Sequence, residues 1–87
     1  MKRIYKYQLE ITDTQTIKTP GIPKFLCAQA QGDKLFVWVE IDDSQPDFVS
    51  EVFVFGTGHP ILDHPIKYLS TVQTHGGQLV WHVYVRG

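Results

Sequence analysis

Hydrophobic and polar residues alternate along most of this chain. In the segment RIYKYQLEI, bulky side chains occupy every second position from Tyr5 to Ile11, and charged or amide side chains lie between them. A period of two predicts a β-strand with one buried face. A second, shorter strand is expected over TIKT. It must end at Pro20 and Gly21, because the segment TPGIPK holds two prolines and a glycine.

Turn residues between alternating segments predict two hairpins. Gly32-Asp33 separates KFLCAQAQ from KLFVWVEI, and His75-Gly76-Gly77 separates YLSTVQT from QLVWHVYV. The strand that follows Asp33 is apolar on both faces. We therefore expect it to be central and covered on both sides, with Trp38 as a core anchor. Another strand is expected over FVSEVFVF, which is continuously apolar from Val52 to Phe55.

These segments make six or seven strands, separated by turns at intervals of about 8–12 residues, and none has a convincing period of 3.6. The prediction is an all-β fold, a single small antiparallel sandwich or barrel with two prominent hairpins. At 87 residues the chain has the length of one domain, residues 1–87. Its aromatic share of 13% and its strands with two apolar faces favour a homodimer or higher oligomer.

Charge and cysteine content exclude several classes of protein. The net charge is −1 and the eight basic residues are scattered, so no basic surface is expected for nucleic acid. No apolar run approaches the length of a membrane span, and the start lacks the apolar core of a signal peptide. We expect a cytoplasmic protein without membrane contact.

Cys27 is the only cysteine and lies in an apolar run, which predicts a buried, inert thiol.

The four histidines are candidate metal ligands or catalytic groups. His59, His64 and His75 fall in predicted turns, and His59 and His64 do not have a usual zinc spacing. His82 lies on a strand, where we expect a half-buried ring whose nitrogens bond neighbouring groups. No serine has the GxSxG context of a nucleophile elbow. The sequence therefore predicts no metal site, no cofactor and no enzymatic activity.

The stretch VFVFGTGHPILDHP carries the best candidate site. Gly56 and Gly58 permit unusual backbone conformations and expose backbone N–H groups. One interpretation is a sharp structural corner stiffened by Pro60. The other is a contact loop, since apolar residues in an exposed, proline-bounded segment often mark an interface. The predicted partner- or ligand-binding residues are Gly56, Thr57, Gly58, His59, Pro60, Ile61, Leu62, Lys67, Trp81 and Tyr84.

Three blocks of the sequence, MKRIYKYQLEITDTQTI, FGTGHPI and YLSTVQTHGGQLVWHVY, together resemble a family of short phage and prophage proteins that is catalogued as a domain of unknown function. They cover roughly half of the chain. The resemblance implies a small protein made inside an infected bacterium. It implies no catalytic residues.

Three functions fit these observations. The first is a non-enzymatic, phage-encoded protein that binds and modulates a host protein, such as an anti-phage defence component. The second is an oligomer that sequesters a nucleotide-like signalling molecule, using Gly56–Gly58, Lys67 and an aromatic ring of Trp81 or Tyr84. The third is a virion or assembly component that self-associates through strand edges.

Overall fold

The computed structural model describes residues 1–61, 63 and 65–86, which form seven strands and one short 3-10 turn. No helix in this described part of the chain is long and apolar enough to cross a membrane. In chain order the elements are β1 (Lys2–Leu9), β2 (Gln15–Pro20), β3 (Lys24–Gln31), β4 (Lys34–Asp42), β5 (Asp47–Gly56), β6 (Lys67–Thr74), η1 (His75–Gly77) and β7 (Leu79–Arg86).

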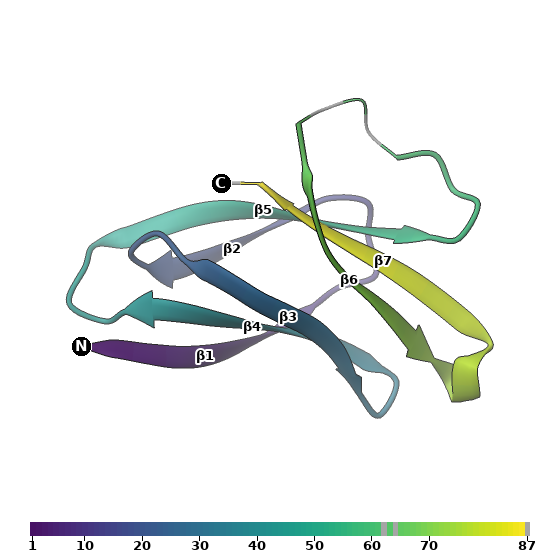
Figure 1. Cartoon of the computed structure of the whole chain (residues 1–87), viewed down its shortest axis with the longest axis horizontal. Helices are drawn as coiled ribbons and strands as arrows, with labels where there is room; N and C mark the ends of the chain where they lie inside the picture. Colours follow the sequence, from purple (N-terminus) through teal and green to yellow (C-terminus); the bar gives the residue numbers. More distant parts are fainter. Residues whose placement is uncertain (62, 64, 87) are drawn as a thin grey trace.

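The strands form two antiparallel sheets, which confirms the expected all-β sandwich (Figure 1). The three-stranded sheet has the order β1-β4-β3, and the four-stranded sheet has the order β2-β5-β7-β6. Strand β4 is central in its sheet, as its apolar sequence predicts. Each sheet contains one of the two expected hairpins, β3–β4 and β6–β7.

The turns of the two hairpins follow from their residues. Gly32 has a φ of 63° and begins a two-residue turn between the paired residues Gln31 and Lys34. A positive φ at the first turn position is the reason that glycine is favoured in such hairpins. The Asp33 carboxylate accepts a hydrogen bond of 2.9 Å from the backbone N–H of His75. The two hairpin turns are thus tied together at one end of the sandwich.

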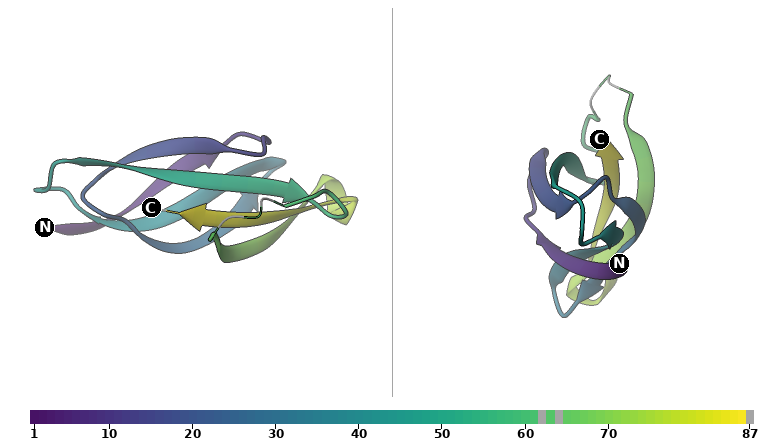
Figure 2. Two further views of the ribbon diagram at one scale, coloured as in Figure 1. Left: turned by 90° about the horizontal axis from the view of Figure 1, so that it is seen from above. Right: turned by 90° about the vertical axis from the view of Figure 1, so that its left-hand side faces the viewer.

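The connection between β5 and β6 differs from the hairpins. Both strands pair antiparallel to β7, so they run parallel to each other on either side of it. The chain must therefore cross the sheet to return from the end of β5 to the start of β6. Residues 57–66 are here called the connector. Its described residues, 57–61, 63, 65 and 66, lie above the four-stranded sheet, on the side away from β1 (Figures 1 and 2).

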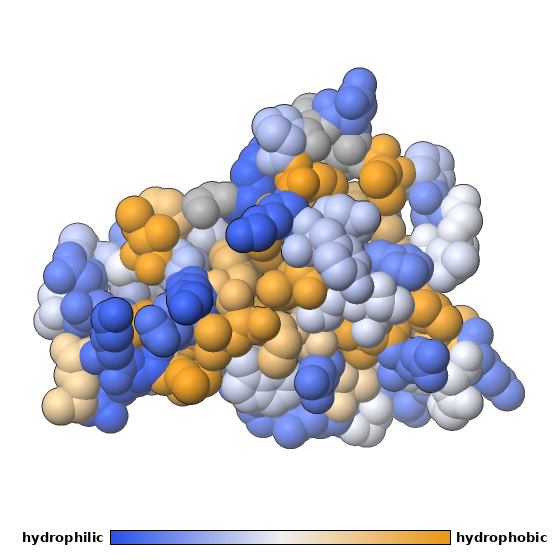
Figure 3. All heavy atoms as spheres, viewed as in Figure 1, coloured by the Kyte–Doolittle hydropathy of each residue, from blue (hydrophilic) through white to orange (hydrophobic). Residues whose placement is uncertain are grey.

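The sandwich is closed along one side by β3 and β6, the edge strands of different sheets. The backbone N–H of Ala28 donates a hydrogen bond of 2.9 Å to the Ser70 hydroxyl. Both strands contain an irregularity in their pairing, at Phe25/Cys27 in β3 and at Tyr68/Ser70 in β6. Hydrophobic residues are exposed between these two strands (Figure 3).

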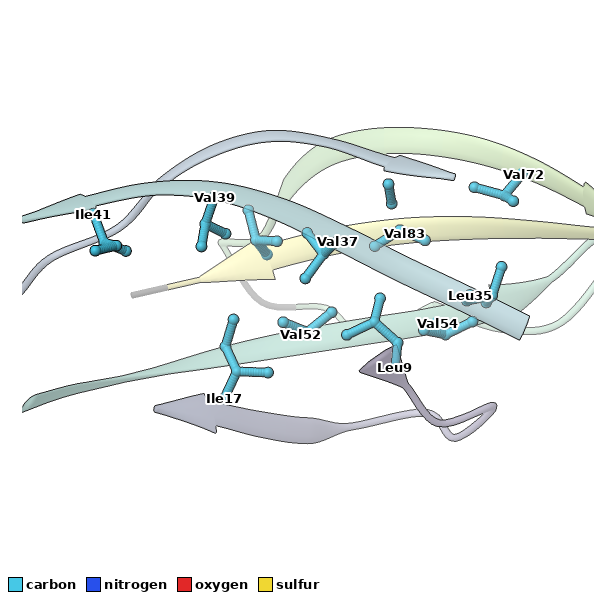
Figure 4. Packing of buried hydrophobic residues seen from close by; sticks show 12 residues of the cluster. Leu9, Ile17, Leu35, Val37, Val39, Ile41, Val52, Val54, Val72 and Val83 are labelled. Carbon is cyan, nitrogen blue, oxygen red and sulfur yellow. The ribbon is translucent and has the colours of Figure 1, made fainter. Parts of the chain in front are cut away.

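The core is aliphatic and lies between the sheets (Figure 4). Alternate residues of β4 face inward and are at most 2% exposed, and they meet alternate residues of β5 and β7. This is the arrangement that period-two patterning on both strands requires. The buried cluster contains Leu9, Ile17, Ala28, Leu35, Val37, Val39, Ile41, Val52, Val54, Val72, Val83 and Val85.

Three expectations about the three-stranded sheet were wrong. Trp38 is not a core anchor, because it faces the outer side of β4 opposite Lys6 and Cys27 and is only half-buried. Cys27 is also half-buried on that side, so its thiol is not enclosed as expected. No second layer of this chain's described residues covers the outer side of β4, although the two-faced apolar pattern predicted one.

Strand β5 is buried on both faces from Val52 to Phe55. Val52 and Val54 face the aliphatic core, so Phe53 and Phe55, which alternate with them, face the other side of the sheet. Phe53 pairs with Tyr84 and Phe55 with His82, and the two phenylalanines are only 1% and 2% exposed. Their rings stack with centroids 6.3 Å apart, and the edge of Tyr84 meets Phe55 at 5.9 Å. The connector passes over the same side of the sheet. A second, aromatic layer therefore lies between the four-stranded sheet and its own crossover connection.

We predict that Leu35→Ala lowers the free energy of unfolding by about 2–5 kcal/mol, because it leaves a cavity at a fully buried position. The exposed Ile4, on the outer face of β1, provides the control. Ile4→Ala should change stability by about 0.5 kcal/mol or less. Urea denaturation of both variants measures the difference, and equal midpoints would contradict the assignment of the core.

The β4–β5 turn holds a carboxylate with a shifted pKa. Asp42 Oδ1 accepts hydrogen bonds from the Ser44 hydroxyl at 2.6 Å and from the Ser44 backbone N–H at 3.0 Å. These bonds stabilise the charged form and lower the pKa of Asp42 to about 2, from an ordinary value of 3.8. The neighbouring Arg3 guanidinium similarly lowers the pKa of Asp43.

This shift predicts how the turn responds to acid. Between pH 3.8 and about 2 the unfolded chain binds a proton at Asp42 that the folded chain does not. The stability contributed by the charged Asp42 is therefore complete well above pH 3.8 and is lost as the pH falls towards 2. Urea midpoints of the wild type and of Asp42→Asn, measured from pH 7 downwards, should converge in this interval. Parallel curves would show that the turn does not hold the carboxylate in this way.

Candidate functional site

The connector begins with a tight turn at the end of β5. The backbone N–H of His59 donates a hydrogen bond of 3.1 Å to the carbonyl of Gly56, so Thr57 and Gly58 are the central turn residues. Gly58 has a φ of 87°, a conformation that residues with a Cβ rarely adopt. Gly56 is required for a different reason. A Cβ there would lie 3.0 Å from the His59 ring, which rests directly on the glycine backbone.

A chain of polar contacts fixes this turn to the outer face of the four-stranded sheet. Thr57 Oγ1 lies 2.8 Å from Nε2 of His82 on β7. The other ring nitrogen of His82 lies 3.2 Å from Thr71 Oγ1 on β6, and that hydroxyl is 2.8 Å from the hydroxyl of Tyr68. Four side chains thus link the connector, β7 and β6 in one hydrogen-bonded series.

The position of His82 agrees with the sequence-based expectation. Its ring is half-buried, and both nitrogens bond neighbouring groups. A neutral imidazole donates from one nitrogen and accepts at the other, and a threonine hydroxyl does either. The two threonines therefore satisfy either tautomer. The observed contacts give His82 an orienting role for the turn.

A groove of about 390 Å³ adjoins the turn. It is lined by Gly56, Thr57, His59, Gln78, Leu79, Val80 and Trp81. Among the lining residues, Leu79 is 41% exposed. Ile61 does not line the groove but follows the turn on the connector, where it is 55% exposed. The turn residues from Thr57 to Pro60 are exposed as well. This part of the molecule therefore combines a fixed backbone with an accessible apolar surface.

The structure brings together only some of the predicted site residues. Gly56, Thr57, His59 and Trp81 line the same groove. Trp81 and Tyr84 extend from opposite faces of β7, because they are three residues apart on one strand. Tyr84 packs on the aromatic layer, with its ring 5.6 Å from that of Tyr68. Leu62 and His64 lie outside the described residues.

Lys67 is placed away from the glycine turn. It is the first residue of β6 and pairs with Val85, whereas Gly56 pairs with Trp81 four residues earlier on β7. At about 3.4 Å per residue this is a separation of roughly 14 Å along the strand alone. Lys67 instead lines a second groove, between the starts of β3 and β6.

The sequence did not predict that Thr71, Tyr68 and Leu79 contribute to this site. The position of Thr71 could have been predicted from the hairpin. A turn at residues 75–77 pairs Thr74 with Leu79, and the same register places Thr71 opposite His82. The position of Tyr68 was harder to foresee, because the pairing shifts between Tyr68 and Ser70. Within residues 1–61, 63 and 65–86, no three His, Cys, Asp or Glu side chains are grouped to hold a metal ion.

The fold and the site define a small two-layer β-sandwich that presents an anchored crossover connector on one face. The chain belongs to the family described as Domain of unknown function (DUF7352), whose model matches residues 1–87. No curated protein and no solved structure matches the chain. The family assignment agrees with the domain of unknown function expected from the three sequence blocks.

The anchoring of the turn gives a direct prediction. Thr57→Val keeps the shape of the side chain but removes the hydroxyl that contacts His82, and should lower the free energy of unfolding by about 0.5–1 kcal/mol. The amide proton of His59, bonded within the turn, should exchange faster with solvent. Thr16→Val on β2, at an exposed position, is the control. Hydrogen exchange by NMR compares them, and unchanged exchange at His59 would show that the hydroxyl does not hold the turn.

Proposed function

We propose that this protein is a non-enzymatic binding protein that docks a partner protein on the connector and the groove beside it. The observation that carries the proposal is the exposure of Ile61, at 55%, on a segment whose first turn is fixed to the sheet. Ile61 comes two residues after this turn, and a segment that is anchored at its start loses less conformational entropy on binding than a free loop does.

The chemistry of this surface favours a protein partner. Leu79 and Trp81 add apolar area beside the turn, and Trp81 donates its indole N–H to Thr74 Oγ1 at 3.0 Å, which fixes the ring. Preformed aromatic and aliphatic side chains are typical anchors of protein interfaces. His59 and the exposed Thr57–Gly58 backbone provide polar groups at the margin. In line with the resemblance to phage and prophage proteins, we take the partner to be a host protein, such as a component of anti-phage defence.

The nucleotide-sequestering function has less support from the geometry. It relied on Gly56–Gly58 and Lys67 acting on one ligand, and these groups lie in different grooves. It remains testable by thermal unfolding in the presence of linear and cyclic nucleotides. A ligand at 100 times its Kd stabilises a protein by about 2.7 kcal/mol, which such a measurement detects readily. The virion-component function predicts instead that the protein is found in purified particles.

The docking proposal predicts the effect of a charge at the connector. Ile61→Asp should weaken retention of the partner from bacterial lysate by more than about tenfold, because binding would bury an unpaired carboxylate. Ile22→Asp is the matched control, since Ile22 is 73% exposed and lies between β2 and β3. It should retain the partner like the wild type.

Quantitative mass spectrometry of the retained proteins gives the readout, with the stoichiometry then measured on the purified complex. Equal retention by Ile61→Asp and Ile22→Asp would rule out the connector as the docking site. Loss of retention in both variants would show that neither substitution is specific.

A further inference from the structure

A second groove, larger than the first, lies where β3 and β6 begin. Its volume is about 620 Å³, which is within the range of about 300–1,000 Å³ typical of small-molecule sites. It is formed by both sheets, with the end of the connector on one side. Its lining residues are Pro23, Lys24, Phe25, Pro65, Ile66, Lys67, Tyr68, Leu69, Val85 and Arg86.

The apolar part of this groove continues the aliphatic core. Phe25 and Leu69 are partly buried and pack against the core cluster, to which Val85 also belongs. Leu69 lies where the pairing of β6 with β7 shifts, and β3 has a corresponding shift beside Phe25. Such bulges redirect side chains and bend strand edges. Two bulged edges facing each other therefore leave an opening over apolar side chains, visible as the hydrophobic area between β3 and β6 in Figure 3.

The charged groups of the groove are cationic. Lys24 and Lys67 begin the two strands that form it, and both are exposed. Within the described residues, no carboxylate forms an ion pair with either lysine. Arg86 is already engaged, because its guanidinium bonds the Glu51 carboxylate and lies over the Phe53 ring. Two lysine ammonium groups are thus left to attract an anion.

We propose that this groove binds a small amphiphilic anion, in which one acidic group is joined to an apolar body. The apolar body would cover Phe25, Leu69 and Val85, and the acidic group would lie near Lys24 and Lys67. This site is separate from the docking surface around the first turn of the connector and does not depend on it.

The lining distinguishes this ligand from a nucleotide. Apart from the basic residues, Tyr68 has the only polar side chain among the described lining residues, and its hydroxyl already contacts Thr71 Oγ1 at 2.8 Å. The other side chains are proline, phenylalanine, isoleucine, leucine and valine, which offer no hydrogen bonds to a base or a ribose. A lipid-like carboxylate and an aromatic sulfonate both fit this lining, because each joins an apolar body to one negative charge.

The test uses 8-anilinonaphthalene-1-sulfonate as the probe and N-phenyl-1-naphthylamine, which lacks the sulfonate, as its neutral counterpart. Titrated into the isotopically labelled protein, the sulfonate should shift the amide resonances of Phe25, Leu69 and Val85. Laurate should displace it, whereas adenosine monophosphate should not. Resonance shifts confined to residues 57–61 and 79–81 would place the probe in the other groove and overturn the proposal.

Charge variants test the role of the lysines. Lys67→Gln should weaken binding of the sulfonate by about two- to fivefold, as expected for one exposed charge pair, and leave binding of the neutral counterpart unchanged. Lys34→Gln is the matched control, because Lys34 lies at the β3–β4 turn, at the other end of β3 from the groove. This variant should bind like the wild type. The proposal fails if both variants bind the sulfonate equally, or if the neutral counterpart binds the wild type as tightly as the sulfonate does.

Discussion

The parallel course of β5 and β6, on either side of β7, determines most of what is unusual in this molecule. Two parallel strands in one sheet require a crossover, and the side that faces β4 is already occupied by the core. The connector can only pass over the outer face. A sheet face that would otherwise be exposed to water thereby becomes the floor of a second layer, into which Phe53 and Phe55 are buried. This layer explains why β5 is apolar at consecutive positions.

The hydrogen-bonded series from Thr57 to Tyr68 is also a consequence of this crossover. The described residues of the crossover pair with no strand of either sheet, so few backbone partners fix its position. Side-chain hydrogen bonds then decide where it begins, and His82 bonds both the turn and β6. Such bonds are directional, so they orient the turn in a way that burial of apolar area alone does not. The His59 ring also rests on the backbone of Gly56, and any residue with a Cβ at position 56 would crowd that ring.

The sequence was sufficient for the class of fold, the hairpins and the inward-facing residues of β4, because alternation and turn residues are local signals. It was wrong for Tyr5 and Ile11, which the alternation placed on a buried face and which are exposed. It was misleading for Trp38, since an apolar side chain on the outer face of a strand has the same pattern whether or not anything covers it. The same ambiguity applied to Phe53 and Phe55, where the covering segment does exist. The exposed turn of the site was foreseen from its glycines and prolines. Its links to His82 and the separation of Lys67 depend on sheet order and register, which the local pattern does not specify.

The connector borders both grooves, with its first turn beside one and Pro65 and Ile66 beside the other. Two sites are coupled when a segment between them has two conformations and ligand binding at either site shifts the equilibrium between those conformations. The first turn is fixed by its own hydrogen bond, by Thr57 and by the ring of His59. Contacts at the far end do not need to alter these local interactions. The two grooves are joined by the hydrogen-bonded series from Thr57 through His82 and Thr71 to Tyr68. Substitutions of lining residues outside this series are therefore expected to have additive effects on stability, and a departure from additivity would show that the grooves are coupled in another way as well.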